Sequence, residues 1–342
     1  MPHRPKQFPW TAFSDERLLS LRLCDLDLAF AGTEVAGFID RLYDELARKR
    51  LSFRPHFWLS DEWFAADGVT GVAIPFYLAH PRLKRLERNQ MLEVEGGTER
   101  SFMRILRHET GHTLESAFQL HRRKRWRELF GFESTPYPKT YAPKPFSKSF
   151  VVHLDMWYAQ AHPSEDFAET FAVWLNPGSR WKKRYAGWGA LKKLEYVDDL
   201  MHELAGAKAR ISNRKHVDPL HTIRKTLREH YDEKRARYAK NKPYFYDNDL
   251  RKLFSDDKKY RPNMSAAKFL VQMKPELRRV VARWTGEYQY TIEQVLDDII
   301  KRCRELKLRL VRSPQRTLVD SIVMVTVQTM NYLHAGNHRV AL

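Results

Sequence analysis

The chain has 342 residues, of which 43% are hydrophobic and 13% aromatic, and its 60 Lys and Arg exceed its 42 Asp and Glu to give a net charge of +18. This size and composition exclude a wholly disordered chain and predict one large domain or two ordinary ones. The excess lies mainly at the C-terminal end, because residues 201–342 contain 30 basic and 16 acidic side chains, against 30 and 26 in residues 1–200. Such an excess suggests an anionic partner.

The predicted elements follow a proline-containing N-terminal arm, residues 1–14. Apolar periodicity favours a helix over 33–48, and alternating or apolar runs favour strands at 53–59, 72–78 and 91–94. A long helix is expected from Thr98 to beyond Leu120, and further helices at 164–175 and 191–204. Few glycines follow Gly206, and helical patterns recur near 219–240, 264–283, 291–308 and 314–334. We therefore expect an α+β domain at 15–206 and a basic, mainly helical region at 207–342.

Signals for export, membrane insertion and disulfide formation are missing from this pattern. No apolar stretch typical of a secretory signal follows Met1, and the longest apolar run, 318–330, is too short and too polar to span a bilayer. Cys24 and Cys303 are far apart and belong to no Cys-x-x-Cys pair, which excludes a disulfide framework. A cytoplasmic protein that does not enter the membrane is expected.

The long predicted helix contains an arrangement of side chains suited to a metal. On a helix, His108 and His112 lie one turn apart, so that two imidazoles can bind one Zn²⁺, and Glu109 lies within reach of a metal-bound water. This is the H-E-x-x-H pattern of zinc peptidases. Gly111 lies inside this predicted helix, where a glycine is less stable than an alanine, which suggests that another segment approaches the helix closely at this position. The alternative is a set of solvated polar residues on an exposed helix face.

A third ligand is expected from the later helix. The metzincin class is excluded, because it requires Gly and His where this chain has Glu115 and Phe118. Ser164 is the predicted N-cap of a helix on which Glu165 and Glu169 share a face, so that one carboxylate can bind the metal while the other fixes the tautomer of a ligand imidazole. Glu165 is the preferred ligand, and the rivals that remain open are His162, Asp166 and Glu169. Acids near the start of this helix also favour its N-terminal dipole without any metal.

Several motifs together resemble the bacterial family of putative zinc-binding metallopeptidases. They are residues 106–112 (LRHETGH), 162–171 (HPSEDFAETF), 53–58 (FRPHFW), 74–81 (IPFYLAHP) and 158–163 (YAQAHP). The resemblance covers about residues 15–205 and implies a zincin-like fold of the gluzincin type, with a small sheet, an active-site helix and a ligand helix. It implies zinc ligands at His108, His112 and Glu165, with Glu169 supporting them.

The resemblance also implies a reaction. A zinc-dependent metallopeptidase would hydrolyse peptide bonds with a Zn²⁺-bound water that Glu109 activates as general base. Lethal-factor-type toxins are more distantly similar and carry a Tyr seven residues before the ligand Glu, which implies that Tyr158 stabilises the oxyanion; the alternative is a packed aromatic side chain. Strand 72–78 is either an edge strand that pairs with a peptide substrate or a plain core strand.

The basic region 207–342 has no recognisable family motif. Its cationic clusters alternate with aromatic residues, as in Lys258, Lys259 and Tyr260, and such a pattern can bind nucleic acid. Acids accompany the bases throughout, which favours a solvated helical surface. The alternative function is therefore a nucleic-acid-binding or protein-binding module with a structural or vestigial zinc site.

Overall fold

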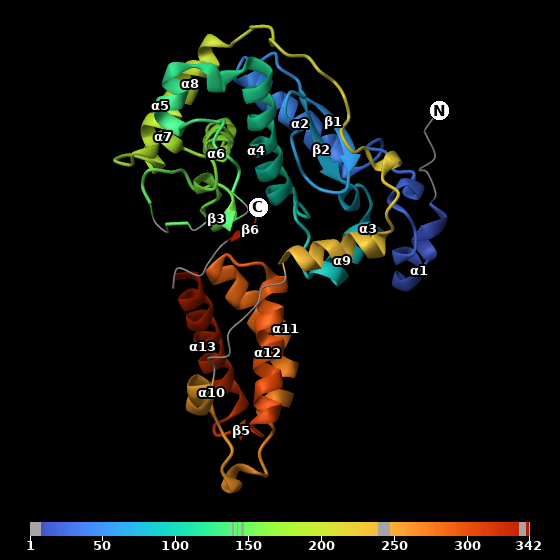
Figure 1. Cartoon of the computed structure of the whole chain (residues 1–342), viewed down its shortest axis with the longest axis vertical. Helices are drawn as coiled ribbons and strands as arrows, with labels where there is room; N and C mark the ends of the chain where they lie inside the picture. The colour runs from blue at the N-terminus through green and yellow to red at the C-terminus, as the bar shows by residue number, and fades with distance from the viewer. Residues whose placement is uncertain are drawn as a thin grey trace. The chain divides into compact units, whose positions relative to one another are not determined.

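A computed structural model describes residues 8–138, 140–141, 143–144, 147–238, 247–334 and 340–341 (Figure 1). The chain forms two compact units, the N-terminal unit, Met1–Glu233, and the helical unit, Lys234–Ala341. The secondary structure is mostly helical with small sheets, which fits the predicted α+β class. Within the described residues, no helix is long and apolar enough to cross a membrane.

The N-terminal unit contains most of the elements. Its helices, 3-10 helices and short strands, in chain order, are η1 (Pro9–Ala12), α1 (Asp15–Leu19), η2 (Leu23–Leu26), α2 (Glu34–Arg48), β1 (His56–Ser60), β2 (Gly71–Pro75), η3 (Phe76–Ala79), α3 (Pro81–Met91), α4 (Glu99–Phe118), η4 (Leu120–Arg122), α5 (Lys124–Phe130), β3 (Thr140–Tyr141), η5 (Asp155–Gln160), α6 (Pro163–Leu175), α7 (Trp181–Arg184), α8 (Ala190–Glu203) and η6 (Leu220–Thr222). Helix α9 (Leu227–Tyr238) crosses the division between the units.

Strands β1 and β2 form a parallel pair with His56 opposite Gly71 and Ser60 opposite Pro75. All five residues of β2 are buried, and Ala73 forms a further antiparallel bridge with Phe64 on the other side of the strand. Strand β2 is therefore a core strand, and this backbone pairing argues against the predicted substrate-binding edge. The expected third strand at 91–94 is wrong, because this segment begins with the last residue of α3 and continues as a loop.

Helix α4 lies between the β1–β2 sheet and α6 and contacts both (Figure 1). Buried side chains of α4, such as Phe102 and Leu114, and of α6, such as Phe167 and Phe171, form the core around it. A buried ion pair joins α4 to α2, because the Arg107 guanidinium donates to both Glu45 oxygens at 2.6 and 2.7 Å. The neighbours of α4 therefore fix its position and rotation.

The helical unit has a core of its own. It contains α10 (Asp247–Leu253), β4 (Phe254–Ser255), η7 (Lys258–Tyr260), α11 (Ala266–Thr285), α12 (Gln289–Glu305), β5 (Arg309–Leu310), α13 (Pro314–His334) and β6 (Val340–Ala341). Strands β4 and β5 pair antiparallel. Apolar side chains of α11, α12 and α13, including Leu270, Leu296 and Val325, are completely buried against one another.

The boundaries of the units differ from the sequence expectation. The units divide after Glu233, whereas the sequence placed the boundary at 206. Residues 207–233 belong to the N-terminal unit because their backbone bonds to it, for example from Arg210 and Ile211 to the Ala117 carbonyl. The predicted N-terminal arm, residues 1–14, lies partly outside the described residues. Its described part is packed, since Trp10 is buried and its indole N–H donates to the Leu26 carbonyl at 3.2 Å.

Candidate metal centre

Helix α4 carries the first two residues of a polar cluster inside the N-terminal unit. The helix begins with a capping box, in which the Thr98 and Ser101 side chains each accept the other's backbone N–H. His108 and His112 follow on one face, with ring centroids 4.8 Å apart and Nε2 atoms 3.1 Å apart. The spacing of four residues thus brings the two imidazoles together, as expected for adjacent helical turns.

Helix α6 adds a carboxylate to this pair. One Glu165 oxygen, Oε2, lies 2.9 Å from His108 Nε2 and 3.2 Å from His112 Nε2. The donor atoms of the three residues all lie within 4.8 Å of one another. The predicted rival Asp166 pairs with Lys193 instead, with a separation of 2.5 Å. The structure therefore brings together the three preferred ligands.

His162 also lies outside this cluster. It is the N-cap of α6, and the prediction of Ser164 in that position is wrong. The imidazole Nδ1 accepts the Ser164 backbone N–H at 3.2 Å, and Nε2–H donates to the Thr135 carbonyl at 2.8 Å. The His162 ring also stacks on Tyr137, with centroids 4.2 Å apart. Both ring nitrogens are engaged in holding the start of α6.

Glu169 lies one turn beyond Glu165 and is completely buried. Its Oε1 accepts a hydrogen bond from His108 Nδ1–H at 2.9 Å, and its Oε2 accepts the Leu154 backbone N–H at 2.8 Å. The bond to Nδ1 leaves the lone pair of neutral His108 on Nε2, the atom that faces Glu165. This is the tautomer that a metal ligand requires.

The donor set and its spacing fit a zinc ion. Two imidazoles and one carboxylate are a common protein ligand set for catalytic zinc. Ligands of a tetrahedral zinc at its usual bond lengths lie roughly 3.3 Å apart, and the three donor atoms here are 2.9, 3.1 and 3.2 Å apart. The burial of Glu165 and His108 is also explained by a cation, since buried charges need partners.

Opposing effects set the protonation of the cluster. Burial raises the pKa of Glu165, but the neighbouring His112 and His108 outweigh it and lower the pKa to about 2. Burial lowers the pKa of His108, but the Glu165 and Glu169 carboxylates outweigh it and hold this pKa well above its usual value. The carboxylates thus favour positive charge at the imidazoles, whether a proton or a metal ion carries it.

Glu109 follows the first histidine directly and is buried in the same region. Burial raises its pKa, although the nearby His108 and His112 oppose the shift. Within the described residues, its carboxylate accepts no hydrogen bond and forms no ion pair. A carboxylate with a raised pKa and unengaged oxygens next to a metal cluster suits a general base.

Gly111 explains how α4 and α6 can lie so close together. A Cβ atom at this position would lie 2.9 Å from the Ala168 Cα, closer than real Cβ contacts allow. The close approach of another segment, expected from a glycine in mid-helix, is therefore confirmed. It brings the residues that flank Ala168, including Glu165 and Glu169, to the histidines of α4.

Tyr158 lies beside the cluster, with its ring centroid 5.6 Å from that of His108. Burial raises the pKa of its hydroxyl, so that the phenol stays protonated and can donate a hydrogen bond. Met156 and Trp157 precede it in left-handed conformations, with φ of 59° and 53°. Non-glycine residues rarely adopt this backbone, so the surroundings must hold this turn in place.

Tyr141 holds this turn, and sequence reasoning did not single it out. Its hydroxyl donates to the Met156 carbonyl at 2.8 Å, and its ring packs edge-on to that of Tyr158, with centroids 6.3 Å apart and an interplanar angle of 74°. The only signal in the sequence was the proline-rich and tyrosine-rich connection at 132–150, too long to be an ordinary loop. His153 was also missed; its Nε2–H donates to the Arg104 carbonyl at 2.9 Å and ties the same segment to α4.

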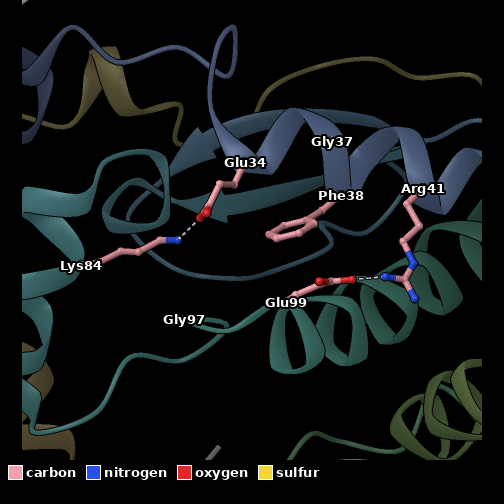
Figure 2. Close-up of a pocket in the computed structure, with 7 residues that line it drawn as sticks. All are labelled: Glu34, Gly37, Phe38, Arg41, Lys84, Gly97 and Glu99. Carbon is pink, nitrogen blue, oxygen red and sulfur yellow. Dashed lines mark hydrogen bonds and ion pairs between the residues drawn. The ribbon is translucent and has the colours of Figure 1, made fainter.

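A cavity of about 510 Å³ lies between α2, α3 and the start of α4 (Figure 2). Phe38 points into it between two ion pairs, one between Lys84 and Glu34 at 2.9 Å and one between Arg41 and Glu99 (Figure 2). Its lining contains none of the cluster residues. The four charges at its rim are already paired, so it adds nothing to the metal centre.

Comparison with known proteins finds one family model that part of this chain resembles. Residues 67–181 match the model of a family described as a putative zinc-binding metallo-peptidase. The resemblance found in the sequence is thereby confirmed, over a shorter stretch that includes both α4 and α6. The family is described as zinc-binding, and the cluster of His108, His112 and Glu165 could hold a metal ion. No curated protein and no solved structure matches the chain, and the zincin-like fold stays a prediction.

Proposed function

We propose that the N-terminal unit is a zinc-dependent peptidase in which His108, His112 and Glu165 bind the metal. The observation that carries this proposal is the convergence of the three donor atoms next to buried Glu109, whose carboxylate has no hydrogen bond or ion pair with a described residue. A structural zinc site needs four protein ligands and no base. Three protein ligands beside a carboxylate suit a catalytic site instead.

Zinc in this site would supply Lewis acidity, which lowers the pKa of water and polarises the scissile carbonyl. Glu109 accepts the proton of the attacking water and then donates it to the leaving amine nitrogen. Glu109 thus acts as base and then as acid within one reaction.

Tyr158 donates its hydroxyl proton in a hydrogen bond to the oxygen that becomes negative in the transition state. Its position beside His108 and its high pKa support this role. Glu169 keeps His108 in the tautomer whose Nε2 faces the metal. Peptide bonds are the proposed substrate class, in keeping with the family description.

The experiment is a comparison of Glu109→Gln with the wild type in zinc content and in hydrolysis of a quenched fluorescent peptide library. We expect one zinc per chain in both proteins and a loss of hydrolysis of about 10²-fold or more in the variant, because general base catalysis contributes roughly this much. Glu99→Gln, an exposed change on the same helix, is the control and keeps both properties. Hydrolysis retained by Glu109→Gln would refute the proposed role.

A further inference from the structure

The N-terminal unit carries an exposed cationic segment, residues 207–216, here called the cationic strap. Lys208, Arg210, Arg214 and Lys215 are all exposed, and no acidic residue occurs between 204 and 217. None of these four side chains forms an ion pair with any described residue. The strap therefore presents four uncompensated positive charges in ten residues.

The start of the strap is fixed by its backbone. The N–H groups of Arg210 and Ile211 both donate to the Ala117 carbonyl, at 2.9 and 3.0 Å. The Asn213 carbonyl then accepts both the backbone N–H and the hydroxyl of Thr70, each at 2.9 Å. These bonds use the main chain, so they leave the cationic side chains available.

The end of the strap is fixed in the same way. The Trp58 indole N–H donates to the Val217 carbonyl at 2.8 Å, and the Ser60 hydroxyl donates to the Asp218 carbonyl at 2.7 Å. The His216 ring stacks on Trp58 with a centroid distance of 5.2 Å. A charged segment that is already ordered loses less conformational entropy when a ligand binds.

The strap begins close to the metal centre. Ala117, to which it is bonded, follows His112 by five residues on the same helix, which corresponds to about 7.5 Å along the helix axis. In the helical unit, by contrast, cations such as Lys274, Arg278 and Arg302 pair with neighbouring acids. The strap thus places uncompensated positive charge on the same part of the N-terminal unit as the metal centre.

We propose that the cationic strap binds an acidic segment of the polypeptide that the metal centre cleaves. This inference rests on the proposed function and names the class of substrate, proteins with a cluster of Asp and Glu near the cleaved bond. A polypeptide fits better than single-stranded nucleic acid, which usually binds to exposed aromatic platforms. The strap contains no Trp, Tyr or Phe, and the ring of His216 is already stacked on Trp58.

The test measures binding apart from cleavage. Fluorescence anisotropy follows a labelled peptide of twelve Glu residues bound to the zinc-loaded full chain with Glu109→Gln, so that the probe stays intact. A variant with Lys208, Arg210, Arg214 and Lys215 changed to Ala is compared with a control in which four exposed cations of the helical unit, none of them ion-paired to a described residue, are changed to Ala. These control positions are Lys268, Arg279, Lys301 and Arg304. Both variants lose four positive charges.

We expect the strap variant to bind the acidic peptide about tenfold more weakly, since four exposed charge contacts of modest strength add up to this. Its affinity should also depend less on salt concentration, and the control should change by less than twofold. Equal losses in the two variants, or no binding of the peptide by the parent, would overturn the proposal. Tighter strap-dependent binding of a twelve-nucleotide oligo(dT) would overturn the choice of an acidic polypeptide.

Two further measurements separate the possible failures. Zinc content reports whether the strap variant still folds around the metal centre. If it does not fold, a double variant with Arg214→Gln and Lys215→Gln replaces it. This double variant is expected to bind the acidic peptide twofold to fourfold more weakly, and an unchanged affinity would contradict the proposal. Wild-type hydrolysis of neutral peptides is measured in parallel. If that hydrolysis is present while strap binding fails, only this inference falls; if hydrolysis is absent while binding holds, the proposed function falls.

Discussion

The N-terminal unit and the helical unit differ in how they place many of their charged side chains. The N-terminal unit buries Glu165, Glu169 and His108 among apolar residues, where each has a partner. The helical unit buries mainly aliphatic side chains and holds ion pairs such as that of Arg302 and Asp247 at the exposed faces of its helices. Buried charges are costly and persist where they serve a site, whereas exposed pairs contribute little. The charge excess of the chain is therefore a poor guide to its chemistry.

The largest expected effect is a difference between the units on zinc removal. Zinc at a hundred times its Kd would stabilise the N-terminal unit by about 2.7 kcal/mol, so a chelator should lower its thermal midpoint by several degrees. The helical unit should not respond. Cys303 is buried in the helical unit, and burial raises its pKa to about 12. In a Cys24→Ser background, the rate of alkylation of Cys303 therefore reports how readily the helical unit opens. Faster alkylation of Cys303 after chelation would show that the metal stabilises both units.

The contact between α4 and α6 gives the next effect. Gly111→Ala should destabilise the N-terminal unit by about 1–3 kcal/mol, because the added methyl group would overlap the Ala168 backbone. Gly37→Ala is a matched control in mid-helix α2, where a Cβ atom meets nothing within 4 Å, and it should stabilise by up to about 1 kcal/mol. Urea unfolding measures both. Equal effects of the two changes would show that α4 and α6 are not in such close contact.

The support of His108 by Glu169 gives a smaller effect. Glu169→Gln should weaken zinc binding by about 10- to 100-fold, as expected when the hydrogen-bond partner of a ligand imidazole loses its charge. Competition with a fluorescent zinc chelator measures the affinity. Glu195→Gln on the exposed face of α8 is the control and should leave it unchanged. An unaltered affinity in Glu169→Gln would remove the proposed role.

The sequence predicted the parts of the site that follow from helical periodicity. His108 and His112 come together because they are one turn apart on α4, and the close contact at Gly111 followed from a glycine in a helix interior. Glu165 was preferred over its rivals, and the structure shows why Asp166 is elsewhere: it is held by Lys193. That partner is distant in sequence and no local pattern indicates it.

Features that depend on distant or competing contacts could not be predicted. The cap of α6 is His162 rather than Ser164, because the imidazole accepts the Ser164 backbone N–H and so places Ser164 within the first turn of the helix. Tyr141 supports the turn before Tyr158 from a segment without periodicity. The units divide after Glu233 rather than at 206, because residues 207–233 are bonded to the N-terminal unit by their main chain, which leaves no mark on composition.

The most direct test of the central claim is the zinc content of the purified chain after dialysis against a limited zinc supply. His112→Ala and Glu165→Ala remove one ligand each, and His202→Ala removes an exposed histidine of α8. The proposal predicts close to one zinc per chain in the wild type and in His202→Ala, and less than about a tenth of that in the two ligand variants, since zinc needs all three protein ligands. A wild type without zinc, or ligand variants with unchanged zinc, would contradict the assignment of the metal centre.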